Sequence, residues 1–311
     1  MWWFVRYSLR IRRIEYRIAE LPLFLIPVLL TIDDLSALTT WPFWGGLVVF
    51  LFLFAFGDLL NCLTDRDLDA IHKPHLSESV YGLGVKNVIG QAVFSAVGAL
   101  GFAAQLSWYL DRWALLAGAA FGLFVAAAYS VEPFRLKGRG LWQLAFYGPG
   151  LFAAPMIYAA MLFVPWPTWE VMAVASAYAV LQTGVLLVNT AEDYIEDRAR
   201  GVRTVIVALG LHRGQTLAAV LAPLGGMGLL ATFAAVLGTD GWTAMEAAGL
   251  VVVVVVAGLV SASVVRLRLR IAGLDEAAAV ALVKHSARWV PLWITSVAMS
   301  GLVAALARFA V

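Results

Sequence analysis

The chain has 311 residues, of which 62% are hydrophobic and only 14% are charged, and its mean hydropathy is +0.86. A soluble domain averages about 45–50% apolar and about 25% charged residues, so this composition excludes an ordinary soluble protein and predicts one that crosses a membrane several times. The formal net charge of +2 is uninformative until it is mapped onto loops, and the single cysteine, Cys62, excludes an intramolecular disulfide.

Residues 1–19 combine aromatic and basic side chains at helical spacing. This combination is typical of a helix that lies in the membrane interface. We therefore expect an interfacial helix over 1–19, followed by one transmembrane domain over 20–311. A basic arm that binds nucleic acid would lack the aromatic residues, so nucleic acid is not an expected partner.

Nine apolar segments follow, to be compared with the roughly 20 residues that a spanning helix needs. The first is short and contains Pro22 and Pro27. The expected fold is all-α, with nine transmembrane helices around a central cavity. The expected spans are 20–33, 43–64, 88–109, 113–130, 141–164, 170–190, 215–237, 245–265 and 289–308.

The basic residues are unevenly divided between the two sides of this arrangement. With nine spans, 20 of the 22 Lys and Arg residues fall in the N-terminal segment and in the loops after even-numbered helices. By the positive-inside rule that side is cytoplasmic. The sequence thus predicts a multi-pass protein of the cytoplasmic membrane, with a cap of loops and an active site on the cytoplasmic face.

The pattern Asn-x-x-x-Asp-x-x-x-Asp occurs twice, each time at the end of an apolar segment. Residues four apart lie on one face of an α-helix, so each copy predicts a stripe of oxygen ligands. The second copy follows the first after 128 residues, which also predicts an internal duplication, with pseudo-repeats at about 20–130 and 141–265 and a ninth helix appended. The two copies are Asn61, Asp65 and Asp69, and Asn189, Asp193 and Asp197.

Two such stripes at matched helix ends would supply hard oxygen ligands, which suit Mg²⁺ ions that hold phosphate oxygens. A single stripe is better explained as a solvated helix end, whereas two in register favour a metal site. Asp58 falls on the first stripe one turn earlier, and Asp67 points elsewhere. Zinc is not expected, because Cys62 stands alone and the four histidines are scattered.

Two further segments carry cations. The first, Tyr-Ser-Val-Glu-Pro-Phe-Arg-Leu-Lys-Gly-Arg-Gly at 129–140, places three cations after a proline turn, where they could meet an anion. The second, at 201–210, follows the second motif and combines glycine with Arg203 and Thr204, which could cap phosphate oxygens. Each segment by itself is also compatible with ordinary loop charge.

Together, the paired motifs, the two basic segments and the nine spans resemble the UbiA superfamily of intramembrane prenyltransferases over about residues 20–305. The resemblance implies Mg²⁺ as cofactor, a prenyl diphosphate as substrate and a lipophilic or aromatic acceptor. One departure is the stretch Ile71-His72-Lys73-Pro74-His75-Leu76, which lacks the arginine that commonly follows the first motif in this family. The resemblance assigns metal binding to Asn61, Asp65, Asp69, Asp193 and Asp197, catalysis to these four aspartates, and diphosphate binding to Asn61, Asn189, Lys73, Arg135, Lys137 and Arg203.

The expected function is Mg²⁺-dependent transfer of an isoprenoid chain from an allylic prenyl diphosphate to an acceptor within the membrane, with release of diphosphate. A terpene cyclase of the same fold would use the same metal site without an acceptor, and the altered stretch at 72–78 keeps this alternative open. A transporter is less favoured, because the charged residues lie at helix ends rather than near the bilayer midplane. Four aromatic residues could line an apolar pocket or simply pack in the core: Tyr147, Phe152, Tyr158 and Tyr178.

Overall fold

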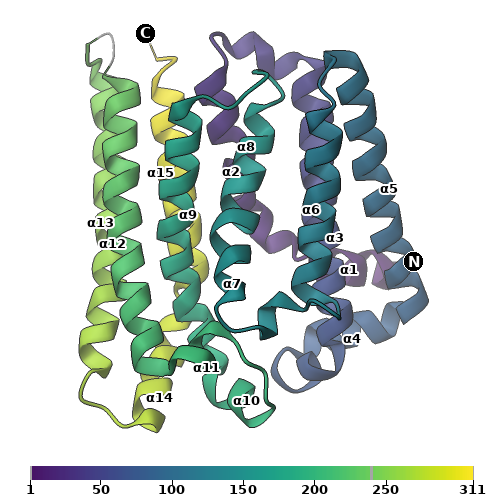
Figure 1. The fold of residues 1–311 in the computed structure, drawn as a ribbon, viewed down its shortest axis with the longest axis vertical. Coiled ribbons are helices and arrows are strands. Elements are labelled where there is room, and N and C mark those ends of the chain that lie inside the picture. The colour runs from purple at the N-terminus through teal and green to yellow at the C-terminus, as the bar shows by residue number, and fades with distance from the viewer. Residues whose placement is uncertain (1, 239–240, 311) are drawn as a thin grey trace. The chain divides into compact units, whose positions relative to one another are not determined.

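The computed structural model describes residues 2–238 and 241–310, and the regular elements in these ranges are all helical (Figure 1). The prediction of an all-α fold is therefore confirmed. Six helices are long and apolar enough to cross a membrane. They are Trp41–Ile71, Val85–Leu110, Trp169–Ala199, Leu211–Leu237, Ala244–Ile271 and Val290–Ala307.

The chain divides into two compact units, which are described separately. Unit 1 consists of residues 1–17 and 36–135, and unit 2 of residues 18–35 and 136–311. In chain order, the helices before residue 136 are α1 (Trp2–Ile11), η1 (Ile14–Tyr16), α2 (Arg17–Thr31), η2 (Leu35–Thr39), α3 (Trp41–His72), α4 (Pro74–Leu83), α5 (Val85–Leu110) and α6 (Ala114–Ser130). Of these, α2 belongs to unit 2 from residue 18 onward. Those that follow are η3 (Leu136–Gly138), α7 (Trp142–Ala145), η4 (Phe146–Ala153), α8 (Ala154–Ala160), α9 (Trp169–Thr190), η5 (Ala191–Asp193), α10 (Tyr194–Ala199), α11 (Val205–Leu209), α12 (Leu211–Leu237), α13 (Ala244–Ile271), α14 (Glu276–Ala287) and α15 (Val290–Ala307).

The expected count of nine spanning helices is not confirmed, because three of the expected segments are shorter or interrupted. The first is the 15-residue α2, and the fourth is the 17-residue α6. The segment expected at 141–164 is broken into α7, the π-helix η4 and α8. Pro149 lies inside η4 and has no amide hydrogen to donate, so it removes one backbone hydrogen bond from this segment.

In unit 1, α3, α5 and α6 pack against one another, and α4 and α1 lie near the end of α3 (Figure 1). α3 begins after Thr40 with a proline in its first turn and ends at the residue before Lys73-Pro74, where the second proline starts α4. The single helix predicted over 1–19 is wrong: α1 ends at Ile11, and Arg13 takes a left-handed conformation with φ 47°. The turn allows residues 12–17 to approach α3.

In unit 2, α9 packs closely on α12, and α12, α13 and α15 continue the layer (Figure 1). Two glycines permit this close approach. A Cβ added to Gly184 would lie 2.6 Å from the backbone nitrogen of Ala222, and one added to Gly225 would lie 2.1 Å from that of Leu181. Small residues at such positions let apolar helices gain dispersion contacts in a lipid environment, where the hydrophobic effect contributes little.

Candidate active site

The last turns of α3 carry the first acidic motif. α3 is one uninterrupted helix through residue 72, so Asn61, Asp65 and Asp69 lie one turn apart on one face, as predicted. Asp69 is 7% exposed, and the side chain of Asp65 is 15% exposed. Withdrawing carboxylates from water is costly unless cations or hydrogen-bond donors compensate them, so this face of α3 favours cations or donors nearby.

Asp67 lies off this face, and its side chain is 74% exposed. It accepts a hydrogen bond from the hydroxyl of Tyr81 in α4, and this bond raises the pKa of Tyr81 above its ordinary value. A guanidinium nitrogen of Arg66 lies 3.8 Å from a carboxylate oxygen of Asp67. Asp67 thus takes part in a solvent-exposed cluster rather than in the stripe.

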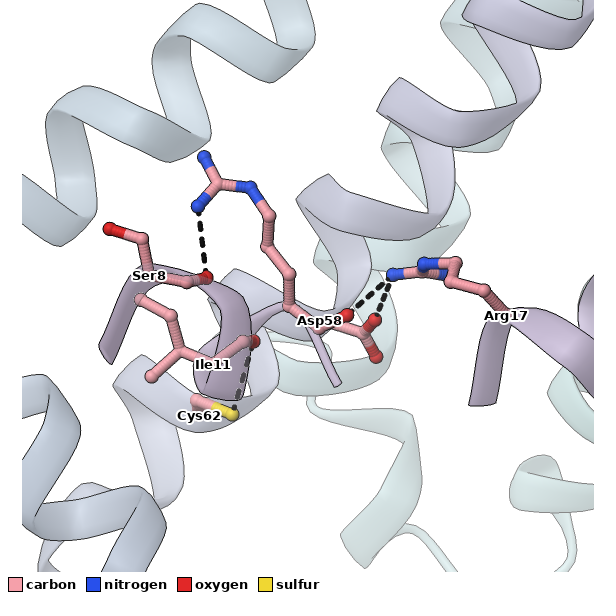
Figure 2. A network of polar contacts seen from close by, with 6 residues as sticks. Ser8, Ile11, Arg17, Asp58 and Cys62 are labelled. Carbon is pink, nitrogen blue, oxygen red and sulfur yellow. Dashed lines mark hydrogen bonds and ion pairs between the residues drawn. The ribbon is translucent and has the colours of Figure 1, made fainter. Parts of the chain in front are cut away.

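Asp58, one turn before the first motif, is bound by the N-terminal segment (Figure 2). Arg17 Nη2 lies 2.5 Å from Asp58 Oδ2, and the two side chains are only 14% and 19% exposed. One turn later, the Cys62 thiol donates to the carbonyl oxygen of Ile11 at 3.6 Å. The charge of Asp58 is therefore compensated inside the protein, and the start of the motif is anchored to residues 11–17.

Further contacts fix the N-terminal segment to α4 and α5. Arg12 Nη1 donates to Gln91 Oε1 of α5 at 2.5 Å, and the Tyr7 hydroxyl donates to Glu78 Oε1 of α4 at 3.1 Å. Burial, and then the positive charge of Arg17, lower the pKa of Arg12. The sequence pattern did not reveal these contacts of the N-terminal segment, because no spacing rule joins residues so far apart in the chain.

Two of the predicted diphosphate-binding cations belong to unit 1. Arg135 adopts a left-handed backbone with φ 36°, and its Nη2 lies 3.8 Å from Asp65 Oδ1. Its Nη1 lies 3.9 Å from Glu132 Oε1. Lys73, the exposed residue directly after α3, donates its backbone N–H to the Asp69 carbonyl oxygen at 2.7 Å. The structure therefore brings a guanidinium to the first motif, at a distance suited to long-range attraction rather than to a direct hydrogen bond.

The second motif lies in unit 2 and differs from the first in its backbone. α9 ends at Thr190, the 3₁₀ turn η5 follows, and α10 begins at Tyr194. Asn189, Asp193 and Asp197 thus lie on three successive elements, so the predicted uninterrupted α-helical stripe is wrong here. Because a 3₁₀ turn has three residues per turn rather than 3.6, the four-residue repeat no longer holds these side chains on one line.

Two charged residues beside the second motif, one acidic and one basic, have partners in α14. Lys284 Nζ lies 2.6 Å from Glu196 Oε1, and Arg198 Nη1 lies 3.0 Å from Glu276 Oε1. Lys284 thus compensates the charge of Glu196 within unit 2. These ion pairs tie α10 to α14.

The last residues of the first basic segment, 136–140, meet the second basic segment within unit 2. Arg139 and Arg203 form an isolated backbone bridge, and the Gly140 N–H donates to the Arg203 carbonyl oxygen at 2.5 Å. The predicted cation Lys137 precedes this bridge in η3. The two guanidinium-bearing segments border a cavity of about 280 Å³, lined by Arg139, Gly140, Leu141, Trp142, Arg203, Ala208 and Leu209.

The four aromatic residues that sequence reasoning considered are all buried in unit 2. Phe152 and Tyr178 make an edge-to-face contact, with ring centroids 5.9 Å apart, as expected for core packing. Tyr147 also has a polar role that the sequence did not reveal: its hydroxyl bonds to Gln143 and Thr190. Among the described residues of either unit, no three His, Cys, Asp or Glu side chains converge as a ready-made metal site.

These features define a multi-pass helical membrane protein with acidic and basic residues gathered at helix ends. The chain belongs to the UbiA prenyltransferase family, whose family model matches residues 22–288. The resemblance read from the motifs is thereby confirmed.

Individual relatives agree with this assignment. The chain is 29% identical over 158 residues to the bacteriochlorophyll synthase 33 kDa chain of Rhodobacter capsulatus, a match that covers 48% of this chain and 49% of that protein. The chain thus matches about half the length of its curated relatives.

Solved structures show the same fold over nearly the whole chain. A structure of digeranylgeranylglyceryl phosphate synthase has a TM-score of 0.65 at 13% identity, covering 97% of this chain and 99% of that one. A UbiA homolog from Archaeoglobus fulgidus, bound to GPP and Mg²⁺, has a TM-score of 0.60 at 16% identity, covering 94% and 99%.

Proposed function

We propose that this protein transfers an isoprenoid chain from an allylic prenyl diphosphate to an acceptor within the membrane and releases diphosphate. The observation that carries the proposal is the pair of acidic motifs, 128 residues apart, in a chain of the UbiA prenyltransferase family. The Mg²⁺ and GPP bound by the Archaeoglobus fulgidus homolog support the same chemistry.

The oxygen donors of the two motifs fit Mg²⁺, which prefers carboxylate and amide oxygens to nitrogen or sulfur. When bound, Mg²⁺ would neutralise charge on the diphosphate and make it a better leaving group. The helical stripe of α3 presents an amide and two carboxylates one turn apart, which suits monodentate contacts to a hydrated ion. The residues that we propose as ligands are Asn61, Asp65, Asp69, Asp193 and Asp197.

The cations of the loops would hold the diphosphate. Arg135 already lies 3.8 Å from Asp65, so an anion bound near this carboxylate would meet a guanidinium. Arg203 stands on a segment fixed by the backbone bridge to Arg139. We propose that these arginines act with Lys73 and Lys137, and that Asn189 assists from the second motif.

The acceptor is proposed to be lipophilic or aromatic. The similarity to a bacteriochlorophyll synthase supports testing a tetrapyrrole as the first acceptor. We further propose nine membrane passes in the cytoplasmic membrane, counting the short α2 and α6 and the interrupted segment 142–160, with the acidic motifs on the cytoplasmic side. The asymmetry of Lys and Arg supports this orientation.

Purified protein should be incubated with Mg²⁺, labelled prenyl diphosphates of several lengths, and candidate acceptors. We expect a prenylated acceptor, and we expect Asp65→Ala and Asp193→Ala each to abolish its formation while the protein stays folded in the membrane fraction. Excess chelator should do the same. A single cyclic terpene formed from the diphosphate alone would contradict a transferase, and full activity of either variant would contradict the metal assignment.

A further inference from the structure

Three buried side chains of unit 2 form a chain of hydrogen bonds. Gln143 in α7, which is 2% exposed, has its Nε2 2.9 Å from the Tyr147 hydroxyl. The Tyr147 hydroxyl lies 2.9 Å from Thr190 Oγ1, at the end of α9. Thr190 Oγ1 lies 2.9 Å from the carbonyl oxygen of Leu186.

Each of these bonds has a defined direction. The Leu186 carbonyl can only accept, so the Thr190 hydroxyl donates its single hydrogen to it. Thr190 Oγ1 must then accept from Tyr147, which leaves the Tyr147 oxygen to accept from the Gln143 amide. Buried chains with one consistent direction polarise their members and are costly to interrupt, because the freed group loses its partner without gaining water.

The other end of the Gln143 amide reaches the second basic segment. Gln143 Oε1 accepts from the backbone N–H of Val205, the first residue of α11, at 2.9 Å. Thr204, just before it, caps the same helix by accepting from the Val207 N–H at 3.4 Å. The Gln143 amide therefore joins Val205, through the Tyr147 hydroxyl, to Thr190 at the end of α9.

We infer that Gln143 is a positioning residue for the prenyl diphosphate. It holds the segment that bears Arg203 in a fixed place relative to Thr190, the neighbour of Asn189 in the second motif. The inference rests on the proposed function, in which Arg203 and Asn189 contact the diphosphate. A cation that is already held in place binds its anion without the entropic cost of ordering a loop, so the benefit falls on substrate affinity.

The chain offers a matched control in Gln182. This amide is also fully buried, and its Nε2 donates to the Tyr178 hydroxyl at 2.9 Å, again four residues away. Its second bond goes to the Ile294 carbonyl oxygen at 3.2 Å and joins α9 to α15 rather than to residues 203–205. Losing either amide removes one buried bond from Nε2 to a tyrosine hydroxyl, but only Gln143 also bonds the basic segment through its Oε1, since the buried Oε1 of Gln182 makes no hydrogen bond.

The test compares Gln143→Met with Gln182→Met. Steady-state kinetics would give kcat and the KM of each substrate, and titration with the unreactive analogue geranyl S-thiodiphosphate would give Kd. We expect Gln143→Met to raise the diphosphate KM and the analogue Kd about tenfold, the size of one lost buried hydrogen bond, with kcat and acceptor KM nearly unchanged. Gln182→Met, which also removes a buried unpaired acceptor, should leave the diphosphate constants unchanged.

Conservative variants of Tyr147 and Thr190, the other two members of the hydrogen-bond series, keep the inference testable if Gln143→Met folds poorly. Tyr147→Phe and Thr190→Val each remove one hydroxyl from the hydrogen-bond series while keeping the shape of the side chain, and both should raise the diphosphate KM. Thr190→Ser retains the hydroxyl and should behave as wild type. Hydrogen exchange at the Val205 amide should accelerate in Gln143→Met and remain slow in Gln182→Met, without any substrate present.

Two results would overturn the inference: an equal rise in the diphosphate constants for both glutamine variants, or unchanged constants in Gln143→Met and Tyr147→Phe. If the wild-type protein binds the analogue but transfers no prenyl group, the proposed function fails. The Kd values of the variants for the analogue then still decide the role of Gln143. If the wild-type protein does not bind the analogue, both fail together.

Discussion

Removing the guanidinium of Arg17 tests whether the N-terminal segment anchors the first acidic motif. In Arg17→Met, Asp58 keeps its charge but loses the partner 2.5 Å away, in a site where its side chain is only 19% exposed. The Arg17 bond to the Arg12 carbonyl oxygen, 2.7 Å long, is lost as well. We expect the variant to be less stable and the start of the motif to be less firmly held.

The magnitude follows from the burial of this ion pair. Exposed pairs contribute about 0–1 kcal/mol, whereas breaking a buried pair costs about 3–5 kcal/mol. With side chains 14% and 19% exposed, the Arg17–Asp58 pair lies between these limits, and we expect a loss of about 2 kcal/mol for Arg17→Met. Asp58→Asn should cost about 1 kcal/mol, because the long arginine stem can carry its charge toward water.

The assay is a double-mutant cycle of Arg17→Met and Asp58→Asn, with unfolding followed by circular dichroism during denaturation in mixed micelles. The double variant should be more stable than the sum of the single losses predicts, with a coupling of about 1 kcal/mol. Arg66→Met with Asp67→Asn is a matched control, because that pair is 3.8 Å apart and exposed, so its coupling should stay below about 0.5 kcal/mol. Additive losses at Arg17 and Asp58 would refute the anchoring role.

Two further predictions concern the loops and the topology. Lys137→Ala should raise the KM of the prenyl diphosphate far more than that of the acceptor, as measured by steady-state kinetics, because a loop cation acts on the anionic substrate; equal effects on both would contradict diphosphate binding. In a Cys62→Ser background, cysteines replacing His75 and Gly273 should react with an impermeant thiol reagent from the cytoplasmic side, and those replacing Asp34 and Trp166 from the other side; a mixed pattern would contradict nine passes.

The local features of this protein were predictable from the sequence because they depend on residues close together in the chain. Apolar content and segment length placed the helices, and six of the expected spans are long apolar helices in the structure. The four-residue spacing correctly placed Asn61, Asp65 and Asp69 on one face of α3. Motif identity was sufficient to recognise the family that the comparison confirms.

The same local reasoning was wrong where the backbone departs from the α-helix. Pro149 signals an interruption of the segment at 141–164, but the extent of the π-helix depends on how this segment packs on α9. The second acidic motif has no proline or glycine between Asn189 and Asp197, so its sequence gave no sign of the 3₁₀ turn. Helix propensity is a weak local preference that tertiary contacts, such as those with α14, can override.

Tertiary structure alone decided which polar residues support the candidate site. Arg17 meets Asp58 across 41 residues of chain, Tyr147 meets Thr190 across 43, and Gln143 meets Val205 across 62. Spacing rules for helices extend over about one turn, and they cannot pair residues on elements that packing brings together. A buried amide or ion pair gains its energy from the partner that the fold supplies, and so its role becomes visible only when the chain is folded.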